Sequence, residues 1–392
     1  MKRFFYMQEQ RLFEFSDGRS SAVECAAVGQ YTENLKQIQR KKEWKTQGTG
    51  AAFMGVYQEE ADFDNIHPAD AVVTADGRLI YGAVLQGGAA VQSKNTAAME
   101  QAEGLILRHA DCTICDMACD PAGKCLALSV ADSWGERKLA ILPLDNNRFQ
   151  FVTEGECRDA NPCFDPADGN ILYYDTSGIA HTERGIVYSP RAVNRLNLAD
   201  GTLDTVLHDE KFDYFQPQTD AQGNLWCIRR PYRDKEQTGG HGLRDMALAP
   251  VKIGKALFGW LDFFTQRYSG ESLRTSGANP AKAKQQSEEE KFIEGNLVKV
   301  RQTKETAADG RLPAAIPKNW ELVRTGADGG QTVLKHSVMA YALLDNGGFL
   351  YSDGRHIIRA DADGSETVLL QTKWAGKLRP CPPTLSDDPE AV

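Results

Sequence analysis

Four cysteines in one short stretch come closest to a spacing that could bind a metal. Cys112, Cys115, Cys119 and Cys125 follow the pattern Cys-x2-Cys-x3-Cys-x5-Cys. Thiolates at such spacings can hold zinc or an iron–sulfur cluster.

Packing offers a second explanation for these cysteines. Cys157 and Cys163 precede an Asp-Pro pair, much as two members of the first group do. Small thiols at nearly equivalent places of a repeat are typical of buried packing positions. On an extended strand, Cys115 and Cys119 would lie on one face and be spread apart, which does not suit convergence on one ion. We therefore expect free thiols, with no metal and no cofactor.

Motifs for catalysis are missing from the sequence. It has no Gly-x-Ser-x-Gly elbow, His-Glu-x-x-His helix, Walker loop or dinucleotide-binding glycine pattern, and its seven histidines are scattered. Residues 361–364 resemble the start of a calcium loop, but the final Glu is absent, and a hairpin turn is the favoured interpretation. We predict no catalytic residues. An enzyme of the lyase or hydrolase type acting on a glycan or peptide through a central channel stays open as an alternative, as does a small-ligand or glycan sensor.

A basic and aromatic cluster is the one polar group that suggests binding. It consists of Arg229, Arg230, Tyr232 and Arg233. Guanidinium groups could contact an acidic peptide or a phosphate. The alternative is that the arginines pair with acidic residues of neighbouring blades, and this alternative is favoured.

The composition is that of a globular protein with a sizeable core. Of 392 residues, 41% are hydrophobic and 25% charged, and the net charge is −9. A negative balance argues against nucleic-acid binding. The apolar run near the N-terminus is too short for a secretory signal, and no run reaches the length of a membrane span. A cytoplasmic protein is the expectation.

A weak internal repeat organises the chain. Five segments each place a glycine turn before an apolar run, starting at Ala75, Pro121, Ala167, Ala221 and Asn346. The first four starts are spaced by 46, 46 and 54 residues, close to the length of a four-stranded propeller blade. We predict that one leucine per segment is buried at an equivalent position on an inner strand: Leu79, Leu126, Leu172, Leu225 and Leu350.

A second repeated unit follows the first. In four segments, alternating residues lead into and out of a turn built from Asp, Asn and Gly: residues 139–153, 193–207, 320–334 and 356–370. This pattern predicts the hairpin of the two outer strands of a blade. The predicted fold is an all-β propeller of about five or six four-stranded blades, formed by residues 1–392 as one domain with a helical insertion.

The first 55 residues fit the repeat less well. Residues 3–26 favour a hairpin that turns near Asp17, within a degenerate first blade or as strands that close the ring. Residues 33–45 indicate a short basic connection of uncertain structure.

Residues 234–295 interrupt the repeat. Within them, residues 250–268 have apolar positions at three- and four-residue steps, which predicts an amphipathic helix. Its aromatic residues include Phe258, Trp260, Phe263 and Phe264. The helix could cap the channel, bind a protein partner or lie on a membrane surface, and its weak charge bias puts the membrane last.

Three segments carry a family resemblance: residues 120–124, residues 161–170 with Asn161-Pro162, and residues 216–223 with Gln216-Pro217. They resemble the blade signature of TolB-like and WD40-like propellers, over residues 70–230 well and over 335–370 partly. The inserted helix is similar to that of accessory propellers encoded in bacteria beside MoxR-type AAA ATPases and von Willebrand A-domain proteins. The resemblance implies a non-enzymatic scaffold that binds such a protein through its insertion-bearing face.

Overall fold

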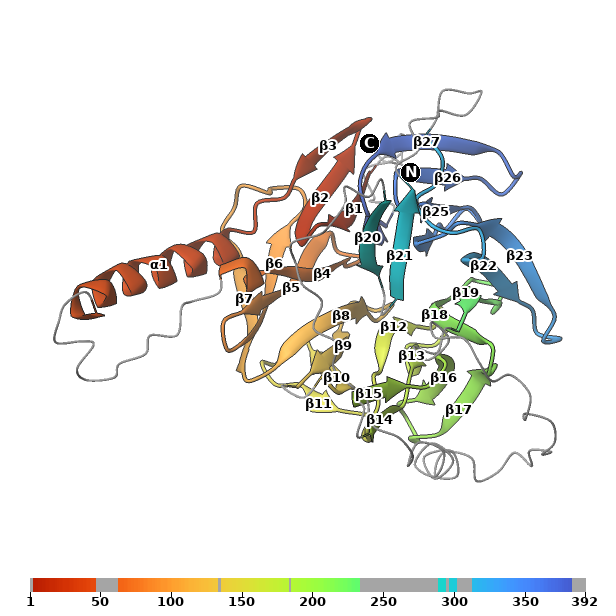
Figure 1. Cartoon of the computed structure of the whole chain (residues 1–392), viewed down its shortest axis with the longest axis horizontal. Helices are drawn as coiled ribbons and strands as arrows, with labels where there is room; N and C mark the ends of the chain where they lie inside the picture. The colour runs from red at the N-terminus through yellow and green to blue at the C-terminus, as the bar shows by residue number, and fades with distance from the viewer. Residues whose placement is uncertain are drawn as a thin grey trace.

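The structure, a computed structural model, describes residues 3–46, 63–132, 135–182, 185–232, 288–293, 296–301 and 312–382. These residues form six four-stranded antiparallel sheets arranged as the blades of a propeller (Figure 1). The expected all-β propeller is confirmed, with six blades. The helix expected at 250–268 lies outside the described residues.

The blades are numbered along the chain, and each is given from its innermost strand outward. Blade 1 consists of β28 (Gly376–Pro380), β1 (Arg3–Gln8), β2 (Arg11–Ser16) and β3 (Arg19–Ala22). Blade 2 consists of β4 (His67–Val73), β5 (Arg78–Leu85), β6 (Gly88–Asn95) and β7 (Gly104–Ala110). Blade 3 consists of β8 (Thr113–Cys119), β9 (Cys125–Ala131), β10 (Arg137–Pro143) and β11 (Gln150–Phe151).

The other three blades follow the same order. Blade 4 consists of β12 (Ala160–Phe164), β13 (Ile171–Thr176), β16 (Ala192–Asn197) and β17 (Leu203–Leu207). Blade 5 consists of β18 (Phe212–Thr219), β19 (Leu225–Pro231), β22 (Glu321–Thr325) and β23 (Gln331–His336). Blade 6 consists of β24 (Ala340–Leu343), β25 (Phe349–Ser352), β26 (His356–Ala360) and β27 (Glu366–Gln371).

Both predicted sub-repeats occupy equivalent places. The five leucines are buried, and each lies in the second strand of its blade, β5, β9, β13, β19 or β25. In each blade the innermost strand comes before the glycine turn. The apolar run after the turn is therefore the second strand from the axis. The four outer hairpins are β10–β11, β16–β17, β22–β23 and β26–β27, as predicted.

The ring is closed by pairing the two ends of the described chain. β28 pairs antiparallel with β1, with Phe4 opposite Pro380 and Phe5 opposite Arg379. This confirms that the N-terminal segment supplies strands for closure, and it covers the inner edge of β1. The core consists of six apolar clusters, one between each pair of neighbouring blades.

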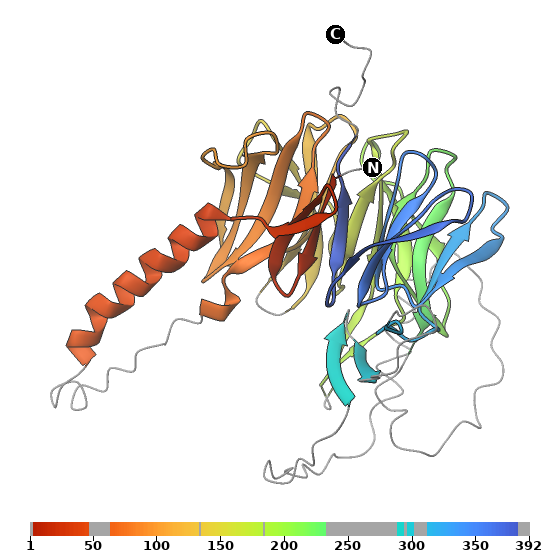
Figure 2. The same ribbon diagram turned by 90° about the horizontal axis from the view of Figure 1, so that it is seen from above.

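The two faces of the disc differ. Blade-to-blade connections and connections from the second to the third strand lie on one side, here called the insertion face. This face carries α1 (Ala26–Thr46), η1 (Phe63–Asn65) and the hairpins β14 (Ile179–Thr182)–β15 (Gly185–Tyr188) and β20 (Glu288–Ile293)–β21 (Asn296–Arg301). Figure 2 shows α1 and the β20–β21 hairpin extending from the same side of the disc. The opposite side, here called the turn face, carries tight turns such as those with φ of 80° at Gly77 and 67° at Gly123.

Helix α1 covers part of the segment whose structure the sequence left uncertain. Its first turn is capped by Glu103, whose carboxylate accepts the backbone N–H groups of Ala26 and Ala27 at 3.0 and 2.8 Å. Val28 packs into the cluster between blades 1 and 2, and the Tyr31 hydroxyl donates to the Gln86 carbonyl. Beyond this anchor the helix projects away from the disc (Figure 1). None of the described helices is long and apolar enough to cross a membrane.

Candidate functional site in the central channel

Bulges in the innermost strands bring polar side chains to the centre of the ring. The pairing register of an innermost strand with its neighbour shifts in β28, β4, β8, β12 and β18. In three of these bulges a residue other than glycine has a positive φ: Asn161 (48°), Gln216 (54°) and Lys377 (52°). A bulge re-aims the side chain that it carries. The same backbone device therefore places three polar groups at one level of the channel.

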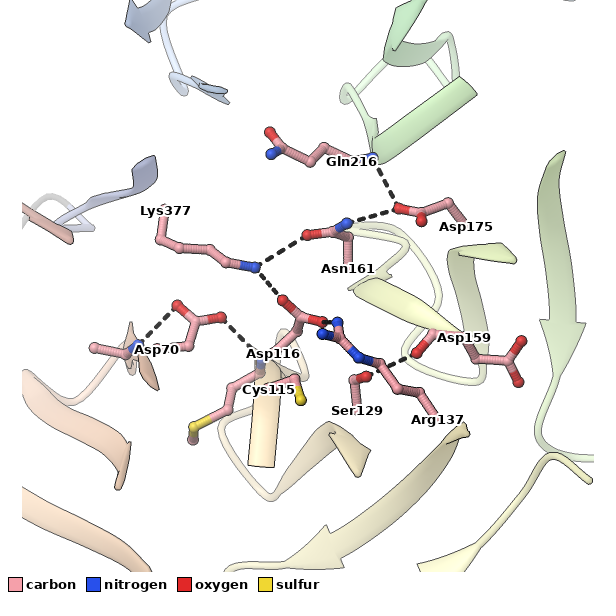
Figure 3. A network of polar contacts seen from close by, with 12 residues as sticks. Asp70, Cys115, Asp116, Ser129, Arg137, Asp159, Asn161, Asp175, Gln216 and Lys377 are labelled. Atoms are coloured by element: carbon pink, nitrogen blue, oxygen red, sulfur yellow. Dashed lines mark hydrogen bonds and ion pairs between the residues drawn. The ribbon is translucent and has the colours of Figure 1, made fainter. Parts of the chain in front are cut away.

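A polar network links four blades at this level (Figure 3). The Lys377 ammonium donates to the Asp116 carboxylate and to Asn161 Oδ1, the latter at 3.1 Å. Asn161 Nδ2 donates to Asp175 Oδ2 at 2.8 Å, and the backbone N–H of Gln216 donates to the same oxygen at 3.0 Å. The network therefore joins blades 1, 3, 4 and 5.

Asp116 is held in its charged form. Burial alone would raise the pKa of its carboxyl group, but the charges of Lys377 and Arg137 outweigh burial and hold that pKa well below its usual range. Arg137 Nη1 lies 3.6 Å from Asp116 Oδ2. A carboxylate fixed between two cations is a poor proton donor or acceptor near neutral pH.

A second buried ion pair lies beside the first. Arg379 Nη2 lies 2.7 and 3.0 Å from the two oxygens of Asp70, and Arg379 Nε donates to the Ala71 carbonyl. The Asp70 carboxylate also accepts the backbone N–H groups of Ala71 and Met117 at 2.8 and 2.9 Å. This single carboxylate therefore connects β4, β8 and β28.

Asp159 differs from both of these carboxylates. Its side chain accepts the Thr176 hydroxyl at 2.6 Å, and Figure 3 shows it pointing away from Lys377. Burial raises the pKa of Asp159, against the opposing effect of its hydrogen bonds. No ion pair is described for it, so its environment favours the protonated form.

The channel contains a cavity of about 230 Å³ on the turn-face side of the network. Its walls are the last residues of the innermost strands, among them Val73, Cys119 and Leu343. The lining includes Lys377 and Arg379 but no acidic residue and no histidine. A set of cations and amides without an acid–base pair suits binding better than proton transfer.

The residues predicted for partner binding are divided by the structure. Arg229 pairs with Glu321 at 2.6 Å, and buried Arg230 pairs with Asp213 at 3.0 Å. The Tyr232 hydroxyl donates to the Tyr188 carbonyl at 2.6 Å. Arg233, Phe258, Trp260, Phe263 and Phe264 lie outside the described residues. The role of this set in partner binding stays a prediction.

The cysteines lie at packing positions. Cys112 and Cys119 contact the cluster between blades 2 and 3, and Cys125 contacts the cluster between blades 3 and 4. All nine are free thiols. The described part of the chain has no group of three or more His, Cys, Asp or Glu side chains arranged to hold a metal ion.

Sequence reasoning did not identify the channel residues. Asp70, Asp116, Lys377 and Arg379 stand in no recognisable motif. The Lys377–Asp116 pair spans 261 residues of sequence and the Arg379–Asp70 pair spans 309. The one available signal was the Asn-Pro and Gln-Pro dipeptides at 161–162 and 216–217, which mark two of the bulges.

The fold resembles that of known propellers, although the sequence does not. No family model and no curated protein matches the sequence. TolB from Acinetobacter baumannii aligns with 96% of this chain at 9% identity and a TM-score of 0.50, over 66% of its own length. A chain of a nidogen/laminin complex aligns with 96% of this chain at 8% identity and a TM-score of 0.50, over 97% of its own length. This protein thus spans just under two thirds of the TolB chain, and it has a six-bladed, TolB-like β-propeller fold.

Proposed function

We propose that this protein is a non-enzymatic scaffold that binds a protein partner through its insertion face. The observation that carries the proposal is the asymmetry between the two faces. Both hairpins inserted into blades, β14–β15 and β20–β21, and the projecting helix α1 belong to the insertion face. On the opposite face the described connections between strands are only two to eight residues long. Long connections held on a rigid closed ring are typical of binding surfaces.

The basic residues of helix α1 suit a partner whose surface is acidic. Between residues 36 and 45 it carries five basic residues (Lys36, Arg40, Lys41, Lys42 and Lys45) and one acidic residue (Glu43). Ile38, in the same segment, is 48% exposed. Because the helix is fixed at its first turn by Glu103, this basic segment is held away from the disc.

The connection between β19 and β22 supplies the rest of the proposed surface. Arg229 and Arg230 lie near the end of β19, just before this connection, and their ion pairs are with Glu321 of β22 and Asp213 of β18. We expect Tyr232, Arg233 and the aromatic residues of the predicted helix, Phe258, Trp260, Phe263 and Phe264, to contact the partner. The first candidates to test are a MoxR-type AAA ATPase and a von Willebrand A-domain protein.

A double substitution, Phe258→Ser with Phe263→Ser, tests the proposal. The purified protein is used as bait for each purified candidate, and binding is measured by surface plasmon resonance. Losing two aromatic anchors should weaken binding by at least ~10-fold. The matched control is Phe151→Ser, which removes a 48% exposed aromatic ring from the outer edge of blade 3 and should leave binding unchanged.

Thermal unfolding of each variant separates the outcomes. Equal binding by a folded double variant would argue against the insertion face as the contact surface. A variant that no longer folds would assign the aromatic residues to a structural lid and remove them from the proposal.

A further inference from the structure

We propose that the channel cavity is a binding site for a carboxylate group on a small apolar body. The site lies on the turn-face side of the polar network, away from the insertion face, so it is a function additional to partner binding there. The carboxylate could belong to a free short-chain acid or to the C-terminus of a peptide, because both present the same group.

The charge around the cavity favours an anion. Lys377 and Arg379 line it, whereas their counter-ions Asp116 and Asp70 do not. The side chain of Asp70 is fully buried and that of Asp116 is 6% exposed, while Arg379 is 25% exposed. The cations therefore stand between the carboxylates and the cavity, and a ligand meets positive charge first.

Gln216 supplies a neutral hydrogen-bonding group. Its backbone N–H is held by Asp175 and its carbonyl accepts the Tyr341 hydroxyl at 2.8 Å, with buried Pro217 following. The side-chain amide has no hydrogen-bond partner among the described residues, and Figure 3 shows it extending into the channel away from Asp175. A residue with φ of 54° held at both backbone ends is a strained position, and strain of this kind is concentrated at binding sites.

Arg379 also lines the cavity. Its Nε and Nη2 atoms are used by the Ala71 carbonyl and by Asp70, whereas Nη1 has no hydrogen-bond partner among the described residues. Arg379 and Cys163 both line the cavity, so the guanidinium borders the same space as the Gln216 amide. An arginine nitrogen and a carboxamide together match the two oxygens of a carboxylate.

The size and the remaining walls define the ligand body. A cavity of about 230 Å³ has room for a short-chain acid. Its walls include Val72, Met117, Pro162 and Leu378, which are apolar and buried. A short aliphatic chain fits such walls.

Isothermal titration calorimetry of the full chain with propionate, butyrate and succinate tests the site. Propionamide and methyl butyrate serve as uncharged controls, and the tetrapeptide Gly-Gly-Ala-Val is titrated with a free or an amidated C-terminus. We expect binding of at least one carboxylate and none of its uncharged counterpart. Preference for the free tetrapeptide identifies a peptide C-terminus as the source, and preference for the acids identifies a metabolite.

Gln216→Gly tests the residue assignment without adding backbone strain, because glycine accepts a positive φ. Loss of one hydrogen bond to a charged group should weaken carboxylate binding by ~10-fold or more. Gln10→Gly is the matched control, since Gln10 also has a positive φ (61°) but lies in the exposed turn between β1 and β2. It should bind like the unaltered protein.

Three results would overturn the proposal. They are the absence of binding by every carboxylate tested, equal binding of acids and their uncharged counterparts, and unchanged affinity in a folded Gln216→Gly variant. Urea unfolding shows that the variant is folded. Because these measurements need no partner protein, their failure leaves the scaffold proposal standing.

Discussion

Replacing Asp70 by Asn should destabilise the closed ring strongly. The Asp70 side chain is fully buried, and its two oxygens accept hydrogen bonds from Arg379 and from the backbone of β4 and β8. Asn keeps the shape but replaces one acceptor oxygen by a donor NH₂ group. That group must then face the guanidinium or a backbone N–H, and the charge of Arg379 loses its counter-ion.

The expected loss in the free energy of unfolding depends on how deeply each of the two side chains is buried. Removing one partner of a buried ion pair costs ~3–5 kcal/mol. Arg379 is 25% exposed, so water recovers part of its solvation, and we expect the lower end, ~3 kcal/mol. Urea unfolding followed by intrinsic fluorescence measures this free energy, provided that both proteins unfold reversibly.

Two comparisons make the test decisive. Asp204→Asn removes the exposed partner of Arg195, a pair with side chains 54% and 40% exposed, and should change stability by less than ~0.5 kcal/mol. In an Arg379→Gln background, Asp70→Asn should cost much less than in the unaltered protein. A loss below ~1 kcal/mol for Asp70→Asn alone, or the same loss in both backgrounds, would refute the reasoning.

Three further predictions concern backbone space and pH. A Cβ atom at Gly88 would lie 2.3 Å from the His109 carbonyl oxygen, so Gly88→Ala should lower the free energy of unfolding by ~2 kcal/mol or more. A Cβ atom at Gly18 meets open space, so Gly18→Ala should lower it by ~1 kcal/mol, through the positive φ alone. Urea unfolding measures both changes. The pKa of Asp116 is lowered in the folded state, so its carboxylate stabilises the fold above the usual carboxyl pKa. This contribution is lost as pH falls below that value. Asp116→Asn should therefore flatten the acid side of the curve of stability against pH. The effect of Asp159 on stability has the opposite sign, because its raised pKa destabilises the folded state above the usual carboxyl pKa. Asp159→Asn should therefore raise stability at neutral pH, and this gain should vanish in acid. A loss of stability at neutral pH would contradict the prediction.

The repeating part of the fold was predictable because each blade uses the same local chemistry. Leu79 and Leu350 occur in runs that start after a glycine turn, and both are buried in second strands. The outer hairpins were predictable because alternating residues flank a turn of Asp, Asn and Gly. In both cases the signal lies within about fifteen residues, a span that the pattern of one sequence can resolve.

The innermost strands and α1 gave weaker signals for physical reasons. A bulge at Gln216 or at Asn161 breaks the alternation by which a strand is recognised. The described contacts of α1 with the disc, at Val28, Tyr31 and Leu35, lie in its first three turns, so the apolar face that a sequence pattern could reveal is short. The contact of Glu103 with its N-terminus spans 77 residues and has no local pattern.

The channel site could not be predicted because it depends on closure of the ring. Lys377 and Arg379 both lie on β28, which completes blade 1 only by pairing with β1 at the other end of the described chain. Their partners, Asp116 and Asp70, lie on the innermost strands of blades 3 and 2. The strand that closes the ring therefore also brings both cations to the cavity. Loosening the pairing of β28 should remove anion binding before it unfolds the outer strands, because those strands keep their own hairpin contacts.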